Sequence, residues 1–221
     1  MARKITSLIL KFVIALSATV GITLQTVAMS QALLYFTIQS NAWIAATCIV
    51  GIVLILMGKT PKRWMYSVKL VFTVSITLTG VVYCTLLAPY MGEEAFNLGS
   101  TLLHVIVPVA AVADFFLYDC AVNYKKWECL VVTVPPFYYL AFAGVGYALN
   151  WDFGYGTNYP YFFLDWGSEA GAFGFIKESP YLGTLYYVLI LLVFVIGIGA
   201  LYTFTANAIY RKIQTADAPQ N

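Results

Sequence analysis

The sequence predicts an all-α integral membrane protein, built as a bundle of six transmembrane helices. Of its 221 residues, 61% are hydrophobic and only 10% carry a charge, whereas about 25% of residues are charged in soluble domains. The apolar residues also gather in runs near the ~20 residues that a helix needs to cross a bilayer. Because these runs lack the alternation of barrel strands, we expect helices to satisfy the backbone in lipid.

The apolar runs divide the chain into six spans within a single domain that covers residues 1–221. Short connections make the successive spans antiparallel neighbours, except where a long segment at 150–182 separates the last two. We expect residues 213–221 to form a flexible tail. The predicted spans are 7–28, 34–57, 66–89, 98–118, 129–149 and 183–208.

The basic residues are distributed unequally between the two sides of the predicted bundle. Lys177 alone falls on one side, in the 150–182 segment. By the positive-inside rule, both termini are then cytoplasmic and the 150–182 segment faces outward, in a plasma membrane or an endoplasmic reticulum alike. The cations on the opposite side are Arg3, Lys4, Lys11, Lys59, Lys62, Arg63, Lys69, Lys125, Lys126, Arg211 and Lys212.

The segment 150–182 is rich in aromatic residues and is interrupted by glycine and proline, so it does not form one helix. Trp and Tyr side chains prefer the headgroup level of a bilayer. The segment is therefore predicted to be a loop that covers the outer end of the bundle as a lid. A plain aromatic belt at the interface explains the same composition equally well.

A cleavable signal peptide at the N-terminus would use Arg3 and Lys4 as its basic region, but Lys11 interrupts the apolar stretch, which favours a retained helix. The four cysteines, Cys48, Cys84, Cys120 and Cys129, show no metal-binding spacing and are expected to be small buried residues. Nucleic acid is not predicted as a partner, because the net charge is only +2 and no basic aromatic cluster occurs. No metal or cofactor is implied, and the sequence does not reveal a protein partner.

A group of polar residues opens the second span, in the stretch "YFTIQSN", and the only histidine lies in the fourth span. Thr37 and His104 are each placed in the outer leaflet and can therefore meet inside the bundle. A threonine hydroxyl becomes a nucleophile when a base removes its proton, and the membrane keeps an imidazole neutral and basic. Asn41, Gln39 or a backbone N–H can then face a developing oxyanion. A pocket at this depth suits a lipid ester.

Each of these residues also has a structural interpretation. Threonine in a membrane helix commonly bonds its own backbone four residues earlier, and His104 can be a structural hydrogen bonder. Asn41 can hold two helices together. Pro108 is expected to kink the fourth span or to free a carbonyl group. Asp114 is expected to pair with Lys69 or Lys125, or to bond a tyrosine.

Three stretches taken together resemble a known family. "YFTIQSN", "LLHVIVPVAAVADFFL" and "YPYFFLDW" are similar, in order and in span count, to the androgen-induced six-transmembrane family, and to its microbial branch in particular. The resemblance implies a threonine hydrolase that cleaves fatty acid esters of hydroxy fatty acids. It places the nucleophile on Thr37 and the base on His104, and adds Tyr159, Tyr161 and Asp165 as residues around the substrate.

The sequence therefore suggests an intramembrane threonine hydrolase whose partners are a lipid ester and the surrounding membrane lipids. The alternative is a non-catalytic lipid-binding or transport protein that uses the same pocket. Paired broken helices and internal repeats, which are typical of secondary transporters, are not evident in the sequence. A purely structural membrane subunit explains the composition but leaves the placement of Thr37 and His104 unexplained.

Overall fold

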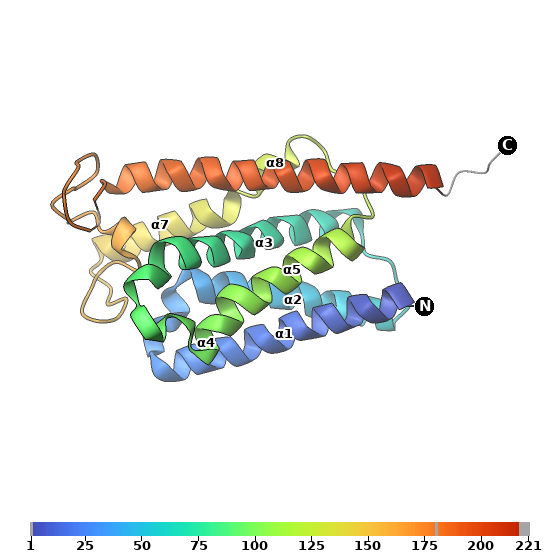
Figure 1. The fold of residues 1–221 in the computed structure, drawn as a ribbon, viewed down its shortest axis with the longest axis horizontal. Coiled ribbons are helices and arrows are strands. Elements are labelled where there is room, and N and C mark those ends of the chain that lie inside the picture. Colours follow the sequence, from blue (N-terminus) through green and yellow to red (C-terminus); the bar gives the residue numbers. More distant parts are fainter. Residues whose placement is uncertain (1, 180, 217–221) are drawn as a thin grey trace.

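The chain folds into six long helices that lie side by side in one bundle (Figure 1). The structure is a computed structural model that describes residues 2–179 and 181–216, and it places no strand among them. The predicted all-α architecture of six spans is confirmed. The helical segments long and apolar enough to cross a membrane are Lys4–Ala28, Phe36–Leu56, Arg63–Tyr90, Leu98–Asp119, Glu128–Ala148 and Thr184–Ala216.

Several predicted boundaries differ from the structure by one to three residues, and the end of the last span differs by more. The second span begins as α2 (Phe36–Leu56), because the preceding Ser30–Leu34 form a separate 3₁₀ helix, η1. The last helix, α8 (Thr184–Ala216), is longer than predicted. The expected flexible tail is therefore wrong for residues 213–216, which continue the helix, and residues 217–221 lie outside the described part of the chain.

The fourth span is a succession of short helical pieces. In chain order they are the α-helix α4 (Leu98–Thr101), the π-helix η5 (Leu102–Ile106), the α-helix α5 (Val107–Asp114) and the π-helix η6 (Phe115–Asp119). Pro108 has no N–H to donate to a carbonyl one turn earlier, and the π-helical turn η5 ends two residues before it. The disturbance expected at this proline thus takes the form of a wider turn, a feature that is common at functional sites.

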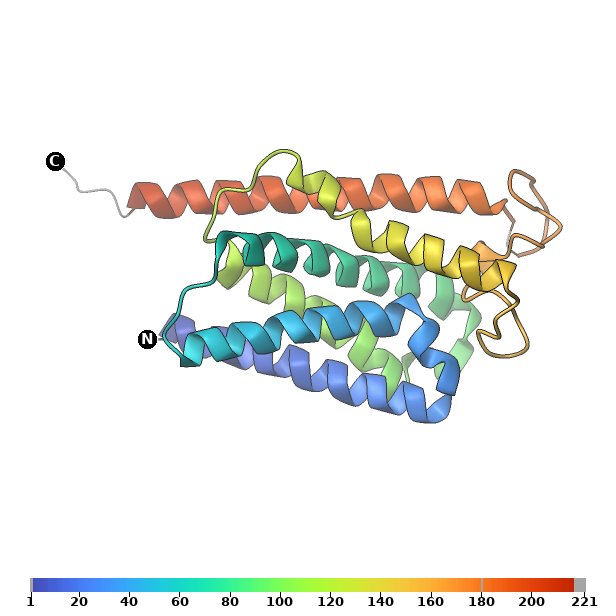
Figure 2. The same cartoon turned by 180° about the vertical axis from the view of Figure 1, so that it is seen from behind.

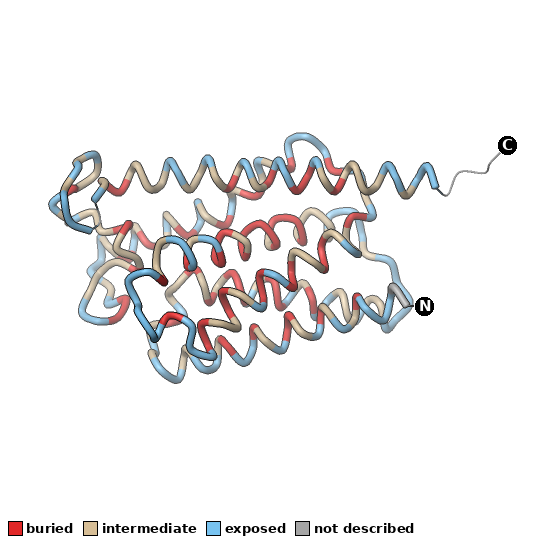
Figure 3. Tube along the Cα trace, in the orientation of Figure 1, coloured by how far each residue is buried: buried red, intermediate tan, exposed pale blue. Residues whose placement is uncertain are grey.

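The helices pack in two groups that share α3 (Arg63–Val82) (Figures 1 and 2). On one side α3 contacts α2 and α5, which also pack against α1 (Ala2–Ala28). On the other side lie α8 and the fifth span, which consists of α6 (Glu128–Val131) and α7 (Val134–Ala148). Buried residues face the interior, whereas the outward faces of α1 and α8 are exposed and largely apolar, as lipid contact requires (Figure 3).

The start of α1 and the end of α8 lie at the same end of the bundle, and the 150–182 loop lies at the opposite end (Figure 1). This arrangement agrees with an even number of spans. α1 is an integral part of the bundle, because its Ile14 and Ala18 are completely buried against the neighbouring helices. The cytoplasmic position of the termini remains a prediction from the charge distribution.

The expectation that all four cysteines are buried was wrong. Cys48 and Cys120 are buried, but Cys84 is exposed and Cys129 is half-buried, and none of the four forms a disulfide in the described part of the chain. Lys11 and Lys69, which the charge distribution assigns to the cytoplasmic side, have side chains that are buried within the bundle. Lys11 and Lys69 are both held there by Asp114, as described below.

Candidate functional site

Thr37 and His104 come from two different spans and meet in the bundle interior. Thr37 is the second residue of α2, and His104 lies in the π-helical turn η5. Thr37 Oγ1 and His104 Nε2 are 3.3 Å apart. The structure thus brings together the two side chains that the sequence suggests as nucleophile and base.

The hydrogen bonds of His104 define its tautomer. Its Nδ1 lies 2.9 Å from the carbonyl oxygen of Ser100, four residues earlier. Because a carbonyl only accepts, Nδ1 carries the hydrogen and Nε2 presents a lone pair to Thr37. The hydroxyl of Thr37 is therefore the donor in this contact, which is the direction that general-base activation needs.

The imidazole is also held by an aromatic stack. The Tyr83 ring lies parallel to the His104 ring, with 3.5 Å between centroids and 11° between planes. The Tyr83 hydroxyl donates to the carbonyl of Ala95, which anchors the stacking ring in turn. His104 itself is only 7% exposed, so its orientation is determined by protein contacts on several sides.

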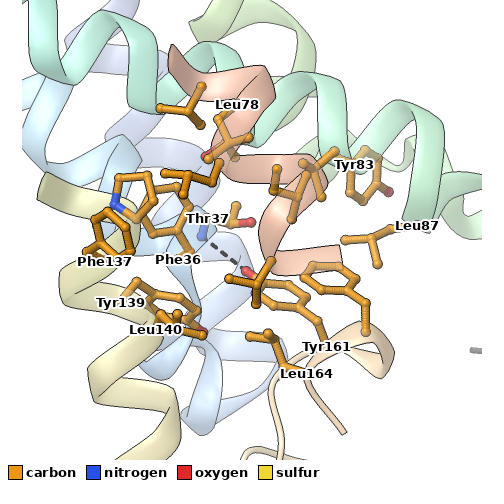
Figure 4. A pocket seen from close by; sticks show the side chains of 18 residues that line it. Phe36, Thr37, Leu78, Tyr83, Leu87, Phe137, Tyr139, Leu140, Tyr161 and Leu164 are labelled. Atoms are coloured by element: carbon orange, nitrogen blue, oxygen red, sulfur yellow. Dashed lines mark hydrogen bonds between the residues drawn. The ribbon is translucent and has the colours of Figure 1, made fainter. Parts of the chain in front are cut away.

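The first turn of α2 leaves backbone donors beside the Thr37 side chain. Tyr35 caps the helix in an extended conformation, and the first N–H groups of any helix have no partner within the helix. Thr37 N–H donates to the Tyr161 hydroxyl at 3.4 Å (Figure 4). Burial raises the pKa of the Tyr161 phenol, so this hydroxyl keeps its hydrogen at neutral pH.

Asn41 links the two segments that carry Thr37 and His104. Its side-chain NH₂ donates to the carbonyls of Thr37, at 2.8 Å, and of Leu103, at 3.3 Å. Asn41 is completely buried, so these bonds bind α2 to the turn that carries His104. Both of its N–H groups are engaged, whereas its Oδ1 has no hydrogen-bond partner among the described residues.

A cavity of about 110 Å³ lies against Thr37 and is lined mainly by apolar side chains (Figure 4). Tyr161, Phe163 and Leu164 of the 150–182 loop form part of its wall, so this stretch of the loop contributes side chains to the cavity. Other aromatics of the loop, such as Tyr155, are exposed. The remaining lining residues include Leu78 of α3, Tyr83 of the π-helical piece η2 (Tyr83–Leu87), Phe137 and Leu140 of α7, and Val188 and Leu191 of α8.

The other predicted substrate contacts lie elsewhere. The Gln39 amide donates to the Leu33 carbonyl at 3.5 Å and does not line the cavity. Asp165 Oδ1 accepts the backbone N–H of Gly167 in a local turn. Tyr159 is half-buried in the loop, outside the cavity wall. Of the five residues suggested as substrate contacts, Tyr161 is the one that lines this cavity.

Sequence reasoning missed Tyr83, Ser100 and Gly80. The spacing of Ser100, one turn before His104, was a signal that could have suggested a backbone partner for the ring. Gly80 allows a close approach of backbones, because a Cβ atom built there would lie 2.9 Å from the carbonyl oxygen of His104. Neither this approach nor the Tyr83 stack has a signature in local sequence.

Replacing Gly80 by alanine is expected to destabilise the protein by about 1–3 kcal/mol, the usual cost of overpacking a core. The added methyl group displaces the turn that carries His104, and the separation of Thr37 and His104 increases. Thermal unfolding in detergent micelles measures the first effect. Gly197→Ala is the matched control, since a Cβ at this exposed position of α8 meets nothing within 4 Å. Equal stability of the two variants would contradict the inferred close packing.

Asp114 lies in a second polar cluster toward the other end of the bundle. Lys69 Nζ is 2.7 Å from Asp114 Oδ2, which is one of the pairings that the sequence suggests, and Lys11 Nζ is 2.7 Å from Oδ1. Asp119 lies 3.1 Å from Lys11 and completes the group. Lys11 was missed as a partner because it is separated from Asp114 by 103 residues.

Fold and site together define a class: a six-span helical membrane protein in which a half-buried threonine contacts a buried histidine beside an apolar cavity. Comparisons with protein-family models, with curated proteins and with solved structures found no match to this chain.

Proposed function

We propose that this protein is an intramembrane threonine hydrolase that cleaves a lipid ester, with Thr37 as nucleophile and His104 as general base. The observation that carries the proposal is the 3.3 Å contact between the Thr37 hydroxyl and the lone pair of His104 Nε2, at the wall of an apolar cavity. The resemblance to the androgen-induced six-transmembrane family supports the same reaction, and a fatty acid ester of a hydroxy fatty acid is the substrate that it suggests.

The reaction has two stages. In the first, His104 Nε2 takes the hydroxyl proton as Thr37 Oγ1 attacks the ester carbonyl, and the resulting tetrahedral intermediate carries the negative charge on the former carbonyl oxygen. The ester C–O bond then breaks, His104 returns the proton to the leaving alcohol, and an acyl-threonine remains. In the second stage water attacks this acyl group with His104 again as base, which releases the fatty acid and restores Thr37.

The tetrahedral oxyanion needs donors, and the first turn of α2 supplies them. The backbone N–H of Thr37 and the protonated hydroxyl of Tyr161 are already adjacent. The positive end of the α2 dipole favours negative charge at this position. Donors placed before the reaction and shielded from water are the most effective kind. Tyr161 therefore replaces Asn41 and Gln39 as the side-chain donor in the mechanism.

The cavity lining supports a substrate that arrives from the bilayer. Phe137 and Leu140 of α7 and Val188 and Leu191 of α8 form one side of the cavity, and both helices present apolar outer faces. An acyl chain can thus lie between α7 and α8 with its ester group at Thr37. The same apolar lining fits the alternative, a lipid-binding or transport protein without covalent chemistry.

A fluorophosphonate probe separates these two functions. We expect the purified wild-type protein to be labelled on Thr37, and we expect Thr37→Ala and His104→Ala to lose the label. Thr79→Ala is the matched control, because Thr79 also lines the cavity but bonds Ser40 and its own helix instead of an imidazole. An unlabelled wild-type protein that turns over no lipid ester would favour the binding function.

A further inference from the structure

A second cavity is lined by Ser7 and Lys11 near the start of α1, and this start lies at the end of the bundle opposite the 150–182 loop (Figure 1). The cavity measures about 350 Å³ and is formed mainly between α2 and α3. Trp43 separates the two cavities, since it packs edge-on against Phe36, which lines the outer one. The proposed hydrolysis does not use this second cavity.

The cavity has a charged floor. Lys11, Lys69 and Asp119 line it, and the completely buried Asp114 lies behind them and binds both ammonium groups. Lys11 and Lys69 are 4% and 6% exposed. Gly51 makes room for this arrangement, because a Cβ there would lie 2.8 Å from the Lys11 stem.

The formal charges of the floor cancel, with two ammonium groups opposite two carboxylates. An ion that enters such a site brings a charge without a counter-charge into a region of low dielectric constant, and this costs several kcal/mol. A ligand with an uncharged head group avoids that cost. The charge balance therefore favours a neutral polar group at the floor.

The floor has hydrogen-bonding capacity for one such group. Lys11 Nζ bonds Ser7, Asp114 and Asp119, which uses its three hydrogens. Lys69 Nζ bonds Asp114 at 2.7 Å and Cys48 at 3.2 Å. Asp119 Oδ2 lies 3.7 Å from Lys69 Nζ, which is too long for a hydrogen bond. A hydroxyl group matches this pair, since its oxygen accepts from Lys69 while its hydrogen is donated to Asp119.

The walls of the cavity are apolar and open toward lipid. Trp43 stacks on Phe72 at 5.5 Å, and Leu54 and Val50 continue the wall along α2. Trp64 lines the cavity and is 61% exposed. A single alkyl chain can lie along these side chains while its head reaches the floor.

From these contacts we propose that the second cavity binds a single-chain lipid with a hydroxyl head group. The hydroxyl bridges Lys69 and Asp119, and the chain lies between α2 and α3. This site is independent of Thr37, so its test does not depend on the proposed hydrolysis.

The test uses a long-chain alcohol with a diazirine and a terminal alkyne, applied to the full protein in phosphatidylcholine nanodiscs. We expect saturable photolabelling on α2 and α3. Ala46→Trp fills the cavity and should lower labelling roughly tenfold, the effect of losing about 1.4 kcal/mol of binding. Ala42→Trp should leave labelling unchanged, because Ala42 is an exposed alanine of the same helix outside the cavity wall. Equal labelling of the two variants would identify the probe as ordinary surface lipid and overturn the proposal.

Head-group charge provides a second, independent readout. Alkyl sulfate and alkyl trimethylammonium probes of the same chain carry fixed charges, and we expect each to label the wild-type protein roughly tenfold less than the alcohol. Asp119→Asn leaves a net positive floor and should shift the preference to the sulfate. A variant that elutes as a folded monomodal species and still prefers the alcohol would rule out the charged floor as the head-group site.

Discussion

Thr37→Val is expected to lower the rate of lipid-ester hydrolysis roughly 10⁴-fold, the scale of effect seen when a catalytic nucleophile is removed. Valine keeps the shape of threonine but has no hydroxyl, so the cavity beside it is preserved. Initial rates with a fluorogenic long-chain acyl ester measure the loss. Binding of a non-hydrolysable ether analogue should be nearly unchanged.

Thr37→Ser is the matched control for this prediction. Serine retains an oxygen 3.3 Å from the His104 ring in the same position of α2, so turnover should remain measurable. If valine and serine reduce the rate equally, the hydroxyl is not the nucleophile. If the valine variant retains full activity, the proposed reaction is wrong.

Asp114→Asn is expected to destabilise the protein by about 3–5 kcal/mol, the cost of breaking a buried ion pair by removing one partner. The carboxylate is completely buried and bonds both Lys11 and Lys69 at 2.7 Å. Its neutralisation leaves two buried ammonium groups opposite Asp119 alone. The midpoint of thermal unfolding in micelles measures the change.

Two comparisons make this prediction specific to buried charge. Glu178→Gln removes a carboxylate from the exposed loop and should change stability by less than about 0.5 kcal/mol. Combining Asp114→Asn with Lys69→Met restores the charge balance and should recover part of the loss. A double variant that is less stable than Asp114→Asn would show that packing, rather than charge, dominates at this cluster.

Part of the site could be predicted because it depends on sequence features within single helices. A polar "YFTIQSN" stretch at the mouth of an apolar span marks an unusual position, and an intramembrane histidine is costly enough to suggest a purpose. Estimates of depth along two helices then place Thr37 and His104 at one level. The hydrogen bond from Asn41 to the Leu103 carbonyl was harder to predict, because it depends on how two helices cross.

Other contacts have no local signature. The Tyr83 stack on His104 and the close approach at Gly80 depend on the angle and depth at which α3 meets the fourth span. Lys11 illustrates the limit most directly. In the sequence it resembles any cation near the predicted cytoplasmic end of a span. Its burial follows only from the packing of α1 beside Asp114.

The sequence by itself determined the class of fold. The apolar runs are long enough to cross a bilayer and carry few charges, and helices are the way to satisfy their backbone groups in lipid. Both features can be recognised within each segment separately, so they do not depend on tertiary contacts. Tertiary structure alone decided the tautomer of His104, the role of Asn41 and the two separate cavities. These depend on side chains from distant segments meeting within hydrogen-bond distance, which no pattern of neighbours along the chain specifies.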